Sequence, residues 1–141
     1  MDASLLKAVP PEVAMKEFDR FCEEWDIETD FSEMSQDDID SFNQAKNPIV
    51  KAIKKGRLVV LEDGRLEVYL VKSDLLERDS IILDVSKADL LAMDNHKEGR
   101  NMHKSLAYSA SMAGIPEKLM YKVHPVDFKI IQKVVLLFLG S

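Results

Sequence analysis

Apolar residues recur at helical spacing in the first third of the chain. Steps of three and four residues link Ala14, Phe18, Phe21, Cys22 and Trp25, and Pro10-Pro11 stands where this helix would begin. Ser35 and Asp38, three residues apart, have the spacing of a helix cap with Asp in the Glu position. They predict a second helix that begins at Ser35 and ends at Gly56. Pro48 lies inside it and predicts either a kink or a fresh start capped by Asn47.

Residues 57–71 carry the strongest strand pattern. Two apolar, β-branched runs flank Asp63-Gly64, a dipeptide typical of a two-residue type I′ hairpin turn. Such a turn would place Val59 opposite Val68 and Leu58 opposite Tyr69. A third strand, Ile81 to Val85, would complete a small sheet, because two strands alone are marginally stable.

The rest of the chain has a helical pattern. Ser86 and Asp89 have the spacing of a helix cap, and the helix they begin would turn Leu90, Leu91 and Met93 inward. Three further helical segments are predicted: one carrying Met102, Leu106, Ala110 and Ala113, a short turn over Pro116–Val123, and a terminal helix over Val126–Leu139. We therefore expect an α+β fold: a small three-stranded antiparallel sheet, a hairpin plus one strand, with a C-terminal helical bundle and an N-terminal acidic helical arm.

Charge divides the chain into two parts. Residues 1–45 hold 13 acidic and three basic side chains, whereas residues 46–141 hold 12 acidic and 16 basic ones, for a net charge of −6. We interpret residues 1–45 as an acidic helical arm and residues 46–141 as the α+β domain. The arm can fold back on the basic body, meet a basic partner, or simply be solvated.

The sequence does not favour an enzyme. The five glycines stand far apart and form no phosphate-binding loop. The single cysteine, Cys22, lies on the apolar stripe and is predicted to be a buried structural thiol. The best metal-like group, Asp94, His96, Glu98 and His103, is more typical of a polar surface turn. We expect no catalytic residues, no cofactor and no metal.

Neither a membrane nor a nucleic acid is an expected partner. The longest apolar run has six residues, Val134 to Leu139, against the roughly 20 that a membrane span needs, and no secretory signal pattern is present at the amino terminus. The basic surplus of residues 46–141 is small and spread over several predicted helices, unlike the concentrated charge of nucleic-acid-binding domains. We expect a cytoplasmic protein.

A series of motifs follows residue 45 in a definite order. A basic helix runs into a GRLV hairpin with a D-G turn, and the strand SIILDV leads to DLLAMDN and a charged glycine turn. Next come a helix that ends at a glycine and a terminal D-F helix that ends in FLG. In this order and spacing the chain resembles the tail assembly chaperones of long-tailed bacteriophages and prophages. The matching residues are Lys51, Ala52, Ile53, Gly56, Arg57, Leu58, Val59, Asp63, Gly64, Leu90, Leu91, Met93, Asp94, Gly99, Met112, Gly114, Asp127, Phe128, Phe138, Leu139 and Gly140.

The resemblance implies a non-enzymatic protein that coats the long helical tape measure protein and keeps it soluble during tail and virion assembly. A tail tube protein and a second copy of the chain are further candidate partners. We expect helix-in-groove protein binding. The predicted contact residues are Met102, Leu106, Ala110, Val134, Val135, Leu137, Phe138 and Leu139; the interpretation of most of them as core residues stays open.

Two other functions remain as alternatives. A prophage regulatory or nucleic-acid-associated protein would use the basic helices, and salt-sensitive DNA binding would favour it. A metal-dependent hydrolase would be centred on His96 and His103.

Overall fold

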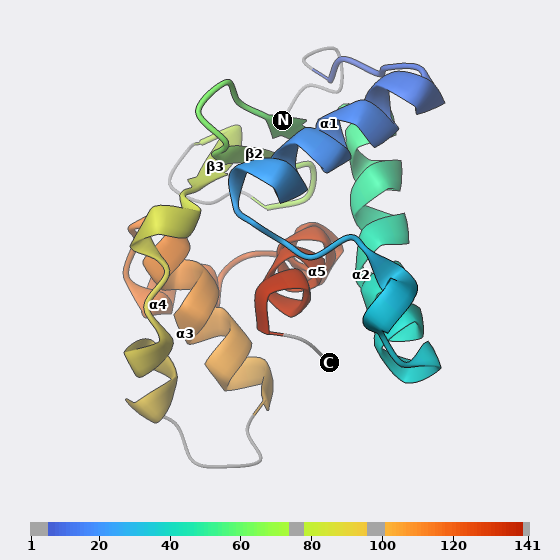
Figure 1. Ribbon diagram of the computed structural model, residues 1–141. Helices are drawn as coiled ribbons and strands as arrows, with labels where there is room; N and C mark the ends of the chain where they lie inside the picture. Colours follow the sequence, from blue (N-terminus) through green and yellow to red (C-terminus); the bar gives the residue numbers. More distant parts are fainter. Residues whose placement is uncertain (1–5, 74–77, 96–100, 140–141) are drawn as a thin grey trace.

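The computed structural model describes residues 6–73, 78–95 and 101–139, which form an α+β fold as expected (Figure 1). A three-stranded antiparallel sheet in the order β1-β2-β3 packs with helices on its buried face. Its strands are β1 (Leu58–Val60), β2 (Leu66–Tyr69) and β3 (Ser80–Leu83). None of the described helices is long and apolar enough to cross a membrane.

The predicted hairpin register is wrong by one residue. Leu58 pairs with Val68 and Val60 with Leu66, because the connection is a three-residue loop rather than a two-residue turn. The Leu61 N–H donates to the Arg65 carbonyl at 2.8 Å, and Gly64 alone of the loop residues Glu62–Gly64 has a positive φ, at 87°. The observed register places the alternate apolar residues Leu58, Val60, Leu66 and Val68 on one buried face.

Helix α1 (Pro11–Glu24) docks on its own chain. The predicted stripe is confirmed, since Ala14, Phe18, Phe21 and Cys22 are all buried. The Arg20 guanidinium donates to the Val60 and Leu61 carbonyls at 2.8 and 3.1 Å, and the Trp25 indole donates to the Gly64 carbonyl at 2.9 Å. These bonds join α1 to the hairpin.

Helix α2 (Gln36–Lys54) follows the short helical turn η2 (Phe31–Glu33). The predicted cap is confirmed: the Ser35 hydroxyl accepts from the Asp38 N–H at 3.2 Å. Pro48 lies inside one continuous helix, so the fresh start at Asn47 is not observed. The boundary expected between residues 45 and 46 falls within α2, and buried side chains from both sides of it share one core.

The helix predicted to begin at Ser86 is wrong. The chain forms two short 3₁₀ segments instead, η3 (Val85–Lys87) and η4 (Leu90–Asn95). The carboxylates of Asp84 and Asp89 accept from N–H groups two residues further on, at 3.0 and 2.9 Å, and such local bonds compete with helical ones. As a result Leu90 and Leu91 are 58% and 72% exposed rather than turned inward.

Three helices complete the structure. They are α3 (Asn101–Ala113), α4 (Glu117–Met120) and α5 (Pro125–Leu139). In Figure 1, α5 lies between α2 and α3, where it also contacts β2. Because α5 has neighbours on several sides, most of its apolar side chains are buried.

Candidate functional site

An apolar groove of about 350 Å³ lies between α3, α4 and the first half of α5. Its rim includes Met102 and Tyr121, which are 51% and 44% exposed. Its buried lining is Leu106, Met120, Val123 and Phe128, and Pro125, Lys129 and Gln132 complete it. A hollow with an apolar floor and an exposed apolar rim is suited to receiving an apolar side chain of a partner.

Two of the eight predicted contact residues line this groove, Met102 and Leu106. Three others, Ala110, Val134 and Val135, are buried in the core, the last two completely. The structure therefore brings the α3 pair to the surface of one groove but places Val134 and Val135 inside the protein.

The end of α5 is partly buried. The Phe138 ring packs edge-on against Phe21 of α1, with 5.8 Å between ring centroids. Leu137 packs against the core and lines a different hollow. The backbone of Leu139 ends α5, and its side chain lies outside the described residues.

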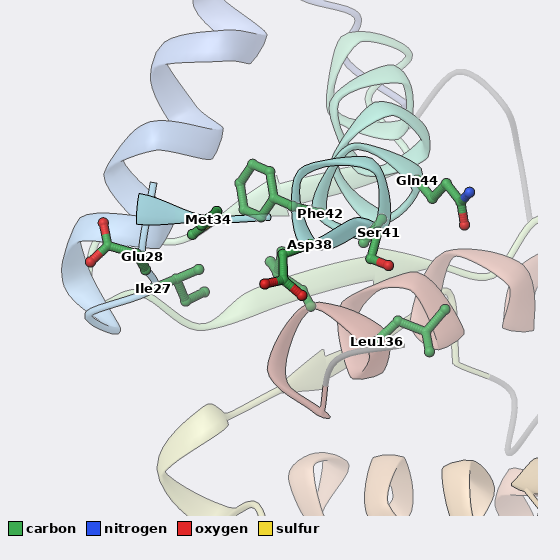
Figure 2. Close-up of a pocket in the computed structure, with 10 residues that line it drawn as sticks. Ile27, Glu28, Met34, Asp38, Ser41, Phe42, Gln44 and Leu136 are labelled. Atoms are coloured by element: carbon green, nitrogen blue, oxygen red, sulfur yellow. The ribbon is translucent and has the colours of Figure 1, made fainter. Parts of the chain in front are cut away.

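That second hollow, of about 270 Å³, lies between α5 and the region from Ile27 to Ala45 (Figure 2). Figure 2 shows side chains of the α1–α2 connection, of α2 and of α5 around it. Its apolar lining includes Met34, Phe42 and Leu136, whereas Glu28 and Asp38 supply negative charge. The two hollows therefore differ in charge.

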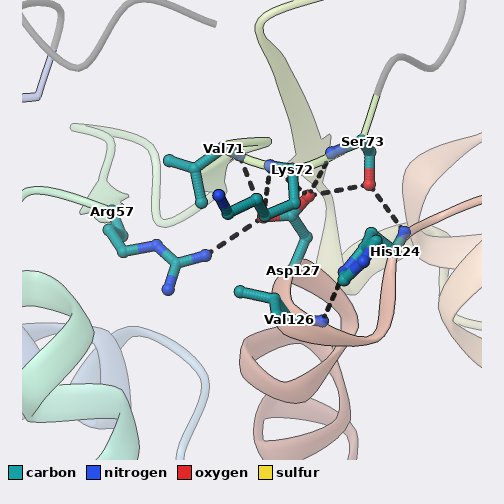
Figure 3. Close-up of polar contacts among 7 residues, drawn as sticks. All are labelled: Arg57, Val71, Lys72, Ser73, His124, Val126 and Asp127. Carbon is teal, nitrogen blue, oxygen red and sulfur yellow. Dashed lines mark hydrogen bonds and ion pairs between the residues drawn. The ribbon is translucent and has the colours of Figure 1, made fainter.

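The most elaborate polar cluster is centred on Asp127, in the first turn of α5 (Figure 3). Its fully buried carboxylate accepts from the N–H groups of Val71, Lys72 and Ser73, at 2.9, 3.0 and 2.7 Å, and from the Ser73 hydroxyl at 2.7 Å. The Arg57 guanidinium donates to the same carboxylate at 3.1 Å. Asp127 thus joins α5 to the chain segments that follow α2 and β2.

The hydrogen bonds keep Asp127 ionised despite its burial. Burial by itself raises the pKa of a carboxyl group, but the bonds from Ser73, Lys72 and Val71 outweigh it, so that the pKa of Asp127 lies below its ordinary value. All these donors come from the protein itself, and the carboxylate is fully buried. We therefore assign Asp127 a structural role, which is to hold the start of α5 and with it one wall of the apolar groove.

The structure describes only some of the residues that the sequence offers for chemistry. Among the described residues, no group of three or more His, Cys, Asp or Glu side chains could hold a metal ion. The Nδ1 atom of His103 lies 2.8 Å from the Tyr121 hydroxyl oxygen. The side chain of Asp94 and the whole of His96 and Glu98 lie outside the described residues. Burial, with a smaller effect from Asp19, raises the pKa of the Cys22 thiol to about 12, in line with an inert buried thiol.

Sequence reasoning missed the Asp127 cluster and most of the groove. The terminal helix was predicted to begin at Val126, one residue after its observed start at Pro125, and an acidic residue such as Asp127 is typical of a first helical turn. The partners of Asp127, however, lie more than 50 residues away in the chain. No local pattern indicates such a contact.

No family model, curated protein or solved structure matches the chain.

Proposed function

We propose that this protein is a non-enzymatic tail assembly chaperone of a phage or prophage, which acts in the host cytoplasm and keeps the tape measure protein soluble during assembly. The observation that carries the proposal is the exposed apolar groove between α3, α4 and α5. The ordered motifs of residues 45–141 support the same class of protein.

The composition of the groove suits a long helical partner. Met102 lies on its rim and Met120 in its floor, and methionine side chains adapt to differently shaped apolar partners. A chaperone that coats a long helix must accept many apolar segments rather than one motif. Helix-in-groove binding, with apolar anchors three or four residues apart, is the mode that we propose.

Co-expression with the neighbouring genes tests this proposal. The affinity-tagged wild-type protein should capture one very long, helix-rich chain, identified by mass spectrometry. Met102→Glu should lose it, because a charge on the groove rim would face apolar anchors. Val13→Glu is the matched control, since Val13 is a similarly exposed apolar residue, 40% exposed, on α1.

Two results would contradict the proposal. In one, no long tail protein is captured although the tagged protein is folded by circular dichroism. In the other, Met102→Glu and Val13→Glu retain the captured chain equally. This second result would mean that the groove is not the binding surface.

A further inference from the structure

A basic surface adjoins the apolar groove on the other side of α5. A hollow of about 320 Å³ between α2 and α5 is lined by four cationic residues, Lys51, Lys55, Arg57 and Lys129, together with Pro48, Ala52, Val126 and Ile130. A neighbouring hollow of about 380 Å³ adds Lys133 and Gln132. We call Lys51, Lys55, Lys129 and Lys133 the basic rim. Among the described residues, no carboxylate lines either hollow.

The charge of the basic rim is not neutralised within the described structure. The described ion pairs join Arg20 to Glu17, Arg57 to Asp127, and Arg65 to Asp63, and none includes a basic-rim lysine. Asp127, the acidic residue in the first turn of α5, is buried and already binds Arg57 and three backbone N–H groups. An anionic partner would therefore meet four available lysines.

The apolar groove and the basic rim form one continuous surface. Lys129 lines the groove and both basic hollows, and Gln132 lines the groove and one of them. A helix with its side chains is about 10–12 Å across, so a helix lying over α5 meets the groove with one face and the lysines with its flank.

We propose that the segment bound here is an amphipathic helix whose apolar stripe is flanked by acidic residues. Its apolar side chains enter the groove at Met102 and Phe128, and its carboxylates reach the basic rim. This inference rests on the proposed function, which supplies the helical form of the partner. It adds the charge that the bound helix carries. Charge complementarity of this kind selects partners and speeds association.

A nucleic acid fits the same surface less well. Phosphates would use the lysines but leave the adjoining apolar groove unfilled. Binders of nucleic acids concentrate basic charge over a whole face, whereas the basic rim consists of four lysines beside an apolar groove.

Three synthetic peptides of the same helical design test the proposal with the full-length protein. Each carries leucines at positions i, i+3, i+4 and i+7, and the flanks are all glutamate, all glutamine or all lysine. Fluorescence anisotropy should show that the glutamate peptide binds about tenfold more tightly than the glutamine peptide at low salt, and that the lysine peptide binds most weakly. The difference should shrink in high salt.

Matched variants locate the effect. Lys51→Glu combined with Lys129→Glu should remove the preference for the glutamate peptide. Lys16→Glu, on the exposed side of α1, should keep it. Met102→Glu should weaken binding of the glutamine peptide, which depends on the groove alone.

Equal affinities for the three peptides, no binding of any peptide, or tightest binding of the lysine peptide would overturn the inference. The inference would also be overturned if the protein bound a DNA duplex and not the glutamate peptide, and if the Lys51/Lys129 double variant abolished that DNA binding. If co-expression captures the tail protein while the peptides are not distinguished, only this inference fails. If the glutamate peptide is preferred while co-expression captures nothing, the proposed function fails instead.

Discussion

Replacing Asp127 by asparagine should destabilise the fold strongly, although the side chain hardly changes size. The carboxylate receives three backbone N–H bonds, the Ser73 hydroxyl and the Arg57 guanidinium, split between its two oxygens. An asparagine amide retains one acceptor oxygen and turns an NH₂ group toward the donors of the other. At least two buried donors then lose their acceptor, and Arg57 loses its counter-charge.

The magnitude follows from these losses. Each unsatisfied buried donor costs about 1–3 kcal/mol, and removing one partner of a buried ion pair costs about 3–5 kcal/mol in all. Because these effects overlap, we expect a loss of about 3–5 kcal/mol in the free energy of unfolding. Urea unfolding followed by circular dichroism should show a midpoint lower by about 2 M, for a slope of about 2 kcal/mol per molar urea.

Asp19→Asn is the matched control, because Asp19 is exposed on α1; it should change the free energy of unfolding by less than about 0.5 kcal/mol. Asp127→Asn should also cost less in an Arg57→Met background, since no unpaired guanidinium remains there. If Asp127→Asn lowers the midpoint no further than Asp19→Asn does, the structural role assigned to the cluster is wrong.

Three further outcomes follow from the same structure. Because the pKa of Asp127 is lowered in the folded state, the ionised carboxylate stabilises the fold fully above the unfolded-state pKa of about 3.9, and this stabilisation is lost as pH falls through the folded-state pKa. The difference in urea midpoint between wild type and Asp127→Asn should therefore disappear in acid, and a difference that persists there would contradict this reasoning. The Cys22 thiol, with its pKa raised to about 12, should react with a chromogenic disulfide reagent only after unfolding; equal rates in the folded and urea-unfolded protein would refute its burial. Gly56→Ala should lower the melting temperature more than Gly114→Ala. Both glycines have positive φ, but a Cβ at Gly56 would lie 2.5 Å from the Lys7 backbone, whereas a Cβ at Gly114 would lie within 4 Å of no atom of the described residues; equal shifts would contradict the close approach.

Local patterns predicted the elements whose causes are local. The stripe of α1, the Ser35 cap and the three strands depend on spacing and on residues close in sequence, and the structure confirms them. The hairpin register was wrong because Asp63-Gly64 suits both a two-residue turn and the observed three-residue loop. The predicted helix after Ser86 was wrong because Asp84 and Asp89 bond locally to the backbone.

The candidate site was only partly predictable for a different reason. An apolar stripe on a helix serves a core or a binding surface equally well, and only the packed structure separates exposed Met102 from buried Val134. The groove and the basic rim each join residues of different helices. Their positions depend on how α5 packs against α2 and α3, which no local pattern specifies.

Solubility of the proposed partner tests the proposed chaperone function most directly. The long helix-rich protein among the products of the neighbouring genes is expressed alone, with the wild-type protein, and with Met102→Glu or Val13→Glu, and its soluble fraction is measured after centrifugation. We expect it to be largely insoluble alone and with Met102→Glu, and soluble with the wild type and with Val13→Glu. The same solubility in all four cultures would contradict the proposed function.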